Sequence, residues 1–183
     1  MSAIPQPAER EELAGRVVLD DLRVEHVGPD YHAWLNDPDV VRFTESRFRA
    51  HTLDDIRAYV KAVNASKTDH MWRILCDGRH VGNVKLASVN LRHRRAALSL
   101  LIGDRNVWGQ GVATQAIRLA TAEGFRRYDD LHKIFAGFYA ANVSSIRAFE
   151  KAGYVVEATL RGNRCLDGEM VDEVLMARFR SDE

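Results

Sequence analysis

The strongest constraint on the fold is a run of three strand-like segments with little chain between them. Residues 71–76, 81–89 and 96–102 are rich in branched and apolar side chains, which is typical of strands. Asp77 and Gly78 form a turn signal between the first two segments. The short connections predict an antiparallel meander, which fits poorly with a doubly wound nucleotide-binding fold.

Helices and further strands are expected on both sides of this meander. The hydrophobic spacing and the capping residues define these elements. In chain order they are a strand at 17–24, a short helix at 28–35, a helical turn at 39–43, a helix at 52–65, the meander, a helix from near 111, a strand at 133–139, a helix after 142, and strands at 155–161 and 171–179. The late β-α-β portion predicts a mixed sheet covered on both faces.

Length and composition indicate one globular domain. The chain has 183 residues, of which 46% are hydrophobic and 28% are charged, and we expect this domain to span residues 15–183. Residues 1–14 carry two prolines and several charges and lack the apolar run of a signal peptide, so a disordered tail is expected. No stretch approaches the ~20 apolar residues of a membrane span, so no membrane partner is expected.

Charge, cysteine and histidine counts narrow the possible partners. Lys plus Arg number 26 and Asp plus Glu number 26, which argues against nucleic-acid binding through bulk charge. The two cysteines, Cys76 and Cys165, form no CxxC motif, and the 7 histidines lack metal-ligand spacing, so no metal site is expected. Because no disulfide framework is indicated, the cytoplasm is the simplest location.

The segment between the third meander strand and the next helix carries the chemical signal. It reads Trp108-Gly109-Gln110-Gly111-Val112-Ala113-Thr114. Glycines let a ligand approach the main chain closely, and the free N–H groups of a helix start suit a phosphate or pyrophosphate. The Gly-Lys-Ser/Thr of a P-loop is absent, and Thr114 occupies the third small position of a dinucleotide fingerprint. A tight turn without a ligand is the alternative.

This segment resembles the pyrophosphate loop of the GNAT N-acetyltransferase superfamily, whose pattern is Arg/Gln-x-x-Gly-x-Gly/Ala. Gly111 falls on the central glycine and Ala113 on the last small position. Trp108 replaces the leading residue, as is common in the branch that resembles ribosomal-protein N-terminal acetyltransferases. Residues 140–161 resemble that branch's second signature, and the whole resemblance covers roughly residues 16–180. The positions that match the second signature are Asn142, Ser145, Glu150, Lys151, Gly153 and Tyr154.

The resemblance implies an α/β fold with a mixed, mostly antiparallel sheet of about seven strands and about four flanking helices. It also implies acetyl-CoA as co-substrate, with its pyrophosphate on the main-chain N–H groups of residues 110–114. The pantetheine arm would run between splayed parallel strands at 96–102 and 133–139, where a main-chain N–H near Leu101 would polarise the thioester carbonyl. The implied cofactor-binding residues are Leu101, Ile102, Trp108, Gly109, Gln110, Gly111, Val112, Ala113, Thr114, Asn142, Ser145 and Phe149.

The implied reaction is acetyl transfer to a primary amine by direct attack. Many family members place a tyrosine where this chain has Phe149, and the acidic residue often found in the preceding strand is absent from residues 96–99. Deprotonating a lysine-like amine of pKa ~10.4 at pH 7 costs about 4.6 kcal/mol, whereas an α-amine costs about 1 kcal/mol. We therefore expect an N-terminal α-amine or an amino-sugar as acceptor, rather than a lysine or a polyamine.

The catalytic candidates are Asn142, which also suits a helix N-cap, together with Glu45 and Tyr139. Ser46, Arg47 and Ser99 are further candidates for the acceptor side. The arginines of residues 42–49 either bind an anion or are solvated. The basic turn at residues 92–95 likewise either attracts an anion or is solvated.

Two alternatives to a protein N-terminal or small-molecule acetyltransferase stay open. One is an acetyltransferase for nucleotide-amino-sugars of polysaccharide biosynthesis, which the segment at 82–104 resembles. The other is a module that binds CoA without transferring acetyl, since Phe149 stands at the tyrosine position. The last strands of this family often mediate dimers, so the resemblance implies a homodimer.

Overall fold

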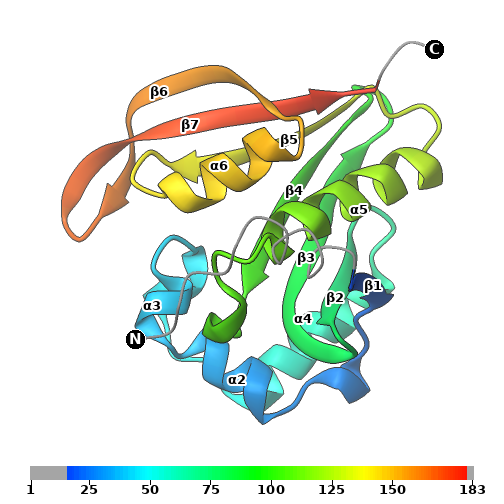
Figure 1. Cartoon of the computed structure of the whole chain (residues 1–183), viewed down its shortest axis with the longest axis vertical. Coiled ribbons are helices and arrows are strands. Elements are labelled where there is room, and N and C mark those ends of the chain that lie inside the picture. Colours follow the sequence, from blue (N-terminus) through cyan, green and yellow to red (C-terminus); the bar gives the residue numbers. More distant parts are fainter. Residues whose placement is uncertain (1–15, 181–183) are drawn as a thin grey trace.

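A seven-stranded mixed sheet forms the centre of the protein (Figure 1), which a computed structural model describes over residues 16–180. The tail expected at 1–14 lies outside the described residues. The strand order is β1-β2-β3-β4-β5-β7-β6, and every neighbouring pair is antiparallel except β4–β5. The strands are β1 (Val17–Asp21), β2 (His70–Cys76), β3 (Arg79–Asn90), β4 (Arg95–Ile102), β5 (Lys133–Tyr139), β6 (Val155–Leu166) and β7 (Glu169–Phe179). The predicted meander is thus confirmed as β2–β4.

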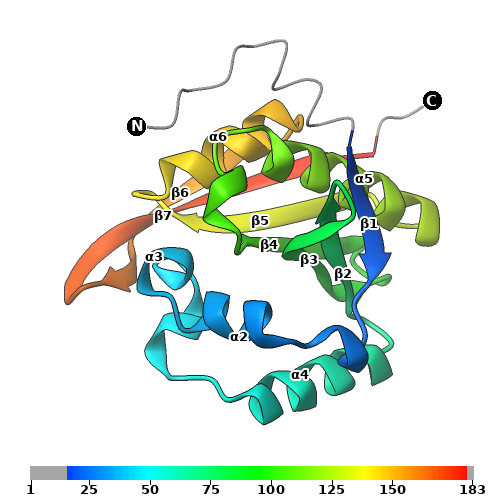
Figure 2. The same ribbon diagram turned by 60° about the horizontal axis from the view of Figure 1, so that its bottom comes forward.

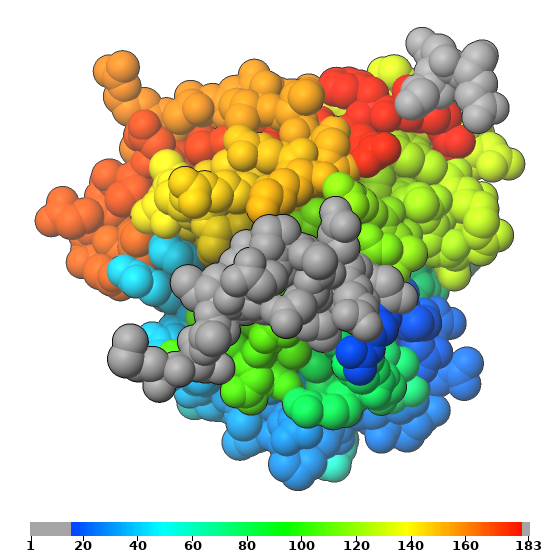
Figure 3. Space-filling view, in the orientation of Figure 1, coloured from blue at the N-terminus to red at the C-terminus, as the bar shows by residue number. Residues whose placement is uncertain are grey.

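Helices cover both faces of the sheet, as expected. Figure 2 shows α5 and α6 above the sheet and α2 and α4 below it, and α6 lies against α5 in the space-filling view (Figure 3). About four helices were expected, and α3 is a fifth because Asp37 caps its four residues. The helices are α2 (Pro29–Leu35), α3 (Pro38–Val41), α4 (Leu53–Ala65), α5 (Val112–Arg127) and α6 (Val143–Lys151).

Some boundaries differ from the sequence prediction. β1 ends at Asp21 because Val24–His26 form a short 3-10 turn. The strands β6 and β7 extend toward each other and meet at Asp167 and Gly168, whose φ angles are +53° and +90°. An Asp-Gly pair of this kind is a strong hairpin signal, so the sequence carried the information that the hairpin is longer than predicted.

The two parallel strands separate along their length, as the family resemblance implied. β4 and β5 pair only from Arg95 to Ala97, opposite Lys133 to Phe135. Beyond these residues β4 continues to Ile102 and β5 to Tyr139 without pairing to each other. The sheet therefore has an opening at its centre, where main-chain groups of both strands are left for another partner.

Two hydrophobic clusters fix the sheet between its helices. Val84 and Leu98 belong to the cluster shared with α5 and α6, which also contains Trp72. Trp34 belongs to the second cluster, formed by α2, α4 and β2, so Trp34 and Trp72 are both core residues. Because side chains alternate along a strand, Asn83 on β3 faces the α2–α4 side.

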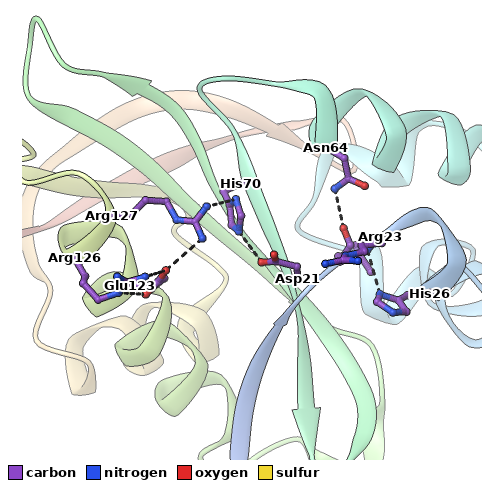
Figure 4. A network of polar contacts seen from close by, with 9 residues as sticks. Asp21, Arg23, His26, Asn64, His70, Glu123, Arg126 and Arg127 are labelled. Carbon is purple, nitrogen blue, oxygen red and sulfur yellow. Dashed lines mark hydrogen bonds and ion pairs between the residues drawn. The ribbon is translucent and has the colours of Figure 1, made fainter.

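A polar network attaches the end of α5 to the far edge of the sheet (Figure 4). The Arg127 guanidinium lies 2.9 Å from His70 Nδ1, and His70 Nε2 lies 2.9 Å from Asp21 Oδ1. Since a guanidinium only donates, Nδ1 accepts and Nε2 donates to the carboxylate. The Glu123 carboxylate accepts hydrogen bonds from Arg127 at 3.4 Å and from Arg126 at 2.7 Å. The helix that begins at the glycine-rich loop is thereby anchored to β1 and β2.

Candidate functional site

The glycine-rich loop adopts a backbone shape that its two glycines make possible. Gly109 has φ +74° and Gly111, the N-cap of α5, has φ +84°. Residues other than glycine rarely adopt such backbone angles. Nothing lies within 4 Å of the place where a Cβ on Gly109 would stand, so backbone angle rather than crowding explains that glycine.

The loop presents a row of unpaired main-chain donors. Within residues 16–180, the N–H groups of Gly109, Gly111 and Val112–Thr114 have no protein acceptor. The first turn of α5 contains no acidic residue, so nothing opposes the positive end of the helix dipole. This arrangement suits an anion with several oxygen atoms, such as a diphosphate.

Side chains of the loop hold its shape rather than add charge. The indole Nε1 of Trp108 donates to the Ile102 carbonyl at 2.9 Å, and Gln110 Nε2 donates to the Asn106 carbonyl at 2.6 Å. Asp104 accepts from the Asn106 amide at 2.9 Å. Trp108 thus ties the loop to the last residue of β4, which is a structural role for the position where the family pattern has Arg or Gln.

Two neighbouring cavities lie on either side of the opening in the sheet. One, of about 450 Å³, extends from the loop along α6, and the other, of about 660 Å³, lies between the sheet and α2 and α4. Their shared walls place the two cavities end to end. The residues that line both are Phe43, Thr44, Leu100, Leu101, Asn142 and Ser145.

Main-chain groups of β4 point alternately toward β3 and β5. The Gly103 amide donates to the Val81 carbonyl of β3, whereas the Arg94 carbonyl accepts from the start of β5. By this alternation Leu100 and Ile102 direct their main-chain groups into the opening, and Leu101 directs its own toward β3. Leu101 lines both cavities, so its contribution to the opening is its side chain.

Asn142 and Ser145 form a helix cap at the wall that the two cavities share. Asn142 Oδ1 accepts from the Ser145 amide at 3.3 Å, so the N-cap of α6 is confirmed. Both residues also line both cavities. The cap therefore fixes the Asn142 side chain at the junction, that is, at the wall shared by the two cavities.

Phe149 lies at the wall of the larger cavity and in the core at once. It is fully buried, and its ring packs edge-on against Phe138 and Tyr154 with centroids 4.8 Å apart in each pair. The Tyr154 hydroxyl is 2.7 Å from the Thr121 hydroxyl, and burial raises the pKa of Tyr154. This neighbouring tyrosine is committed to the core.

The other two predicted catalytic residues line the larger cavity next to residues that it shares with the smaller one. Tyr139 is buried, with the guanidinium groups of Arg47 and Arg164 at 5.3 and 5.5 Å from its ring centroid. Arg164 also lies 3.1 Å from Glu45 and 2.5 Å from Glu173. Glu45 and Tyr139 both line the cavity, joined through Arg164.

Of the remaining acceptor-side candidates, some line the larger cavity and others are bonded to main-chain carbonyls elsewhere. Ser46 and Ser99 line the larger cavity, whereas Arg47 donates to the Cys165 carbonyl at 2.5 Å. Arg94 of the basic turn donates to the Asp130 carbonyl at 2.8 Å. Since this turn precedes β4 and the glycine-rich loop follows it, a whole strand separates the turn from the proposed anion site.

Sequence reasoning missed several residues of the larger cavity. Lys85 of β3 contacts the Asp69 carboxylate at 2.9 Å and the Tyr59 hydroxyl at 3.2 Å. Burial alone would lower the pKa of Lys85, but these partners outweigh it and raise that pKa, so the side chain is a cation. Asn83 and Arg164 were also missed. The alternation of side chains along a strand predicts that Asn83 and Lys85 share one face of β3. It does not predict that this face borders a cavity.

Two kinds of feature are absent from the part of the chain that the structure describes. Within residues 16–180 no cluster of three His, Cys, Asp or Glu side chains is placed to hold a metal ion. No helix in the same range is long and apolar enough to cross a membrane.

Solved structures share this fold. A ribosomal L7/L12 α-N-protein acetyltransferase in complex with CoA superposes with a TM-score of 0.81 at 16% identity, covering 91% of this chain and 96% of that one. A spermidine N-acetyltransferase from Vibrio cholerae in complex with CoA and spermine has a TM-score of 0.79 at 20% identity, covering 90% and 96%. At these identities the likeness concerns the fold.

Curated relatives match the chain over part of their length. Spermidine N(1)-acetyltransferase of Escherichia coli K12 is 29% identical over 114 residues, which are 62% of this chain and 60% of that protein. A probable N-acetyltransferase, YjcK, of Bacillus subtilis 168 is 33% identical over 110 residues, or 58% and 59%. The match thus spans about 60% of the length of these relatives.

The family model described as "Acetyltransferase (GNAT) domain" matches residues 16–155. With most of its length matched by that model and its splayed sheet in place, the chain belongs to the GNAT acetyltransferase domain family.

Proposed function

We propose that this protein is an acetyl-CoA-dependent N-acetyltransferase acting on a primary amine. The observation that carries the proposal is the continuity of the site. Unpaired loop amides lead through the opening between β4 and β5 into a second cavity whose largely apolar wall carries a few polar side chains. Such a path suits a long anionic thioester at one end and an amine at the other.

The loop and the opening divide the binding of acetyl-CoA between them. The diphosphate accepts hydrogen bonds from the amides of Gly109 and of residues 111–114, and the pantetheine arm lies in the opening. The main-chain groups of Leu100 and Ile102 face that arm. A thioester carbonyl accepts hydrogen bonds, so the amides of these two residues are the donors that polarise it, while the Ile102 carbonyl accepts from Trp108.

The reaction is a direct transfer. The amine nitrogen attacks the thioester carbonyl carbon, the C–S bond breaks, and the proton lost by the amine ends on the leaving sulfur. Holding the two reactants together contributes about 7–11 kcal/mol. Glu45, Tyr139 and Asn142 line the cavity or its junction and are the groups we propose to orient the amine and move its proton.

The relatives by themselves leave the acceptor class open, because they include both spermidine and protein N-terminal acetyltransferases. The cavity offers no tyrosine at position 149 and no acid on β4. We propose an amine of low pKa, an N-terminal α-amine or an amino-sugar, because deprotonating it costs about 1 kcal/mol at pH 7 rather than about 4.6.

Thiol release from acetyl-CoA tests this function. The assay compares N-terminal peptides, nucleotide-linked amino-sugars, spermidine and aminoglycosides at pH 7. Release stimulated by a peptide or an amino-sugar is expected. Binding of acetyl-CoA without release for any amine would instead support a module that holds CoA and does not transfer.

We also propose that the protein is a cytoplasmic homodimer that associates through β6. This strand is an edge of the sheet, and Val155, Val156 and Leu160 on it are 56%, 52% and 39% exposed. Exposed apolar edges favour pairing with a second chain. Sedimentation equilibrium is expected to give twice the chain mass, and Leu160→Arg is expected to give monomers. A monomeric wild-type protein at micromolar concentration would refute this association.

A further inference from the structure

Asn83 carries a hydrogen-bond donor that the rest of the described chain does not satisfy. It is 2% exposed, lies on β3 and lines the larger cavity. Its Oδ1 is 2.9 Å from His80 Nε2, whereas its Nδ2 has no partner within residues 16–180. A buried amide N–H without a partner is costly, so such groups generally meet a ligand or water.

The position of Asn83 is close to the proposed reaction centre. It is opposite Leu101 in the β3–β4 pair, and Leu101 lines both cavities. Lys85, two residues along β3, lines the same cavity. The unsatisfied donor therefore belongs to the acceptor side, beside the junction where the amine meets the thioester.

His80 takes up one end of the Asn83 amide. Its ring packs edge-on against Trp34, with centroids 5.0 Å apart, and lies 6.3 Å from the Tyr31 ring. Burial lowers the pKa of His80, so the ring is neutral at pH 7. With Oδ1 placed on this ring nitrogen, His80 donates from Nε2, and the NH₂ group is the end of the amide left without a protein partner.

We infer that Asn83 donates a hydrogen bond to an oxygen atom of the acceptor and so selects amines that carry an oxygen near the reacting nitrogen. This inference rests on the proposed function. A peptide N-terminus offers its first carbonyl and an amino-sugar offers a hydroxyl. A polyamine has N–H groups and no oxygen, so it leaves Asn83 unpaired, and a site that pairs a substrate oxygen discriminates strongly against analogues that lack it.

Charge around the cavity does not separate the acceptors. Lys85 pairs with Asp69, and Arg164 pairs with Glu45 and Glu173. Asp55, which accepts from Thr52, stays a carboxylate. Selection between acceptors therefore falls to the Asn83 donor.

Steady-state kinetics of Asn83→Ala and Asn83→Asp in the full-length protein test the inference. Three probes are used: a tripeptide amide, a nucleotide-linked 4-amino-sugar, and spermidine. Asn83→Ala is expected to lower kcat/KM about 10- to 100-fold for the oxygen-bearing probe that wild type prefers. Its effect on spermidine and on the KM for acetyl-CoA is expected to be under about threefold. Asn83→Asp replaces the donor with an anion and is expected to shift preference toward spermidine.

Two further variants separate selection from folding. His80→Phe keeps an aromatic ring but removes the donor that orients Asn83, so it is expected to lower the ratio of peptide or sugar to spermidine turnover. Asn90→Ala, on the exposed end of β3, is the matched control and is expected to leave that ratio unchanged.

The outcomes distinguish this inference from the proposed function. Equal loss for all three probes in Asn83→Ala, or no loss, overturns the inference while the acetyltransferase function stands. Wild-type preference for spermidine overturns it in the same way. Absence of thiol release with every amine overturns the function and the inference with it.

Discussion

Replacing Gly111 with valine is expected to weaken acetyl-CoA binding about 100-fold or more. Gly111 has φ +84° at the start of α5, an angle that a β-branched side chain strongly disfavours. The loop must therefore change shape, and its amides no longer converge on one anion. Each hydrogen bond to a charged group contributes about 1.5–3 kcal/mol, so loss of two accounts for this factor.

The matched control for this substitution is Gly168→Val. Gly168 has φ +90° in the β6–β7 turn, with nothing within 4 Å of an added Cβ. Both variants carry similar backbone strain, of order 1–3 kcal/mol, but only Gly111 belongs to the loop. Calorimetric titration with acetyl-CoA and thermal melting measure the two effects. Equal acetyl-CoA affinity in both variants would contradict the assignment of the loop.

Replacing Glu173 with alanine is expected to lower the free energy of unfolding by about 3 kcal/mol, the low end for breaking a buried ion pair. The Glu173 side chain is 7% exposed and accepts from Arg164 and Asn163, each at 2.5 Å. Its removal leaves Arg164, whose Nε already lacks a partner within the described residues, beside Tyr139. Arg164 is 32% exposed, so water reaches it and limits the loss.

The comparison variant is Glu157→Ala, which removes a carboxylate from the same β-hairpin. Glu157 pairs with Lys133 at 2.6 Å, but their side chains are 29% and 27% exposed, so the expected loss is at most about 1 kcal/mol. Urea unfolding at pH 7 measures both. A loss for Glu173→Ala no greater than for Glu157→Ala would show that the Arg164–Glu173 pair does not support the cavity wall.

Elements that depend on neighbouring residues were predictable. Thr52 and Asp55 form a reciprocal capping box, Asn142 caps α6, and Asp77 has the positive φ of its turn. Each rests on contacts within three or four residues, which sequence patterns report directly. The glycines of the pyrophosphate loop belong to the same class, because their role is a property of the local backbone.

The wall of the larger cavity was not predictable in this way. Arg164 contacts Glu45 across 119 positions of sequence and Glu173 across 9. These contacts exist because β7 pairs with both β5 and β6, with Tyr139 opposite Glu173. A shift of one residue in that register would turn Glu173 to the other face of the sheet.

The amino-acid sequence alone thus determined the family resemblance, the order of the elements and the anion-binding character of the loop. The tertiary structure decided that Asn83 ends in a cavity with one donor unsatisfied, and that Arg164 joins Glu45 to Glu173. The physical reason is the distance along the sequence between the residues that determine each feature. Caps, turns and periodicity depend on nearby residues, whereas strand register and the splay of β4 from β5 depend on the packing of the whole sheet between its helices.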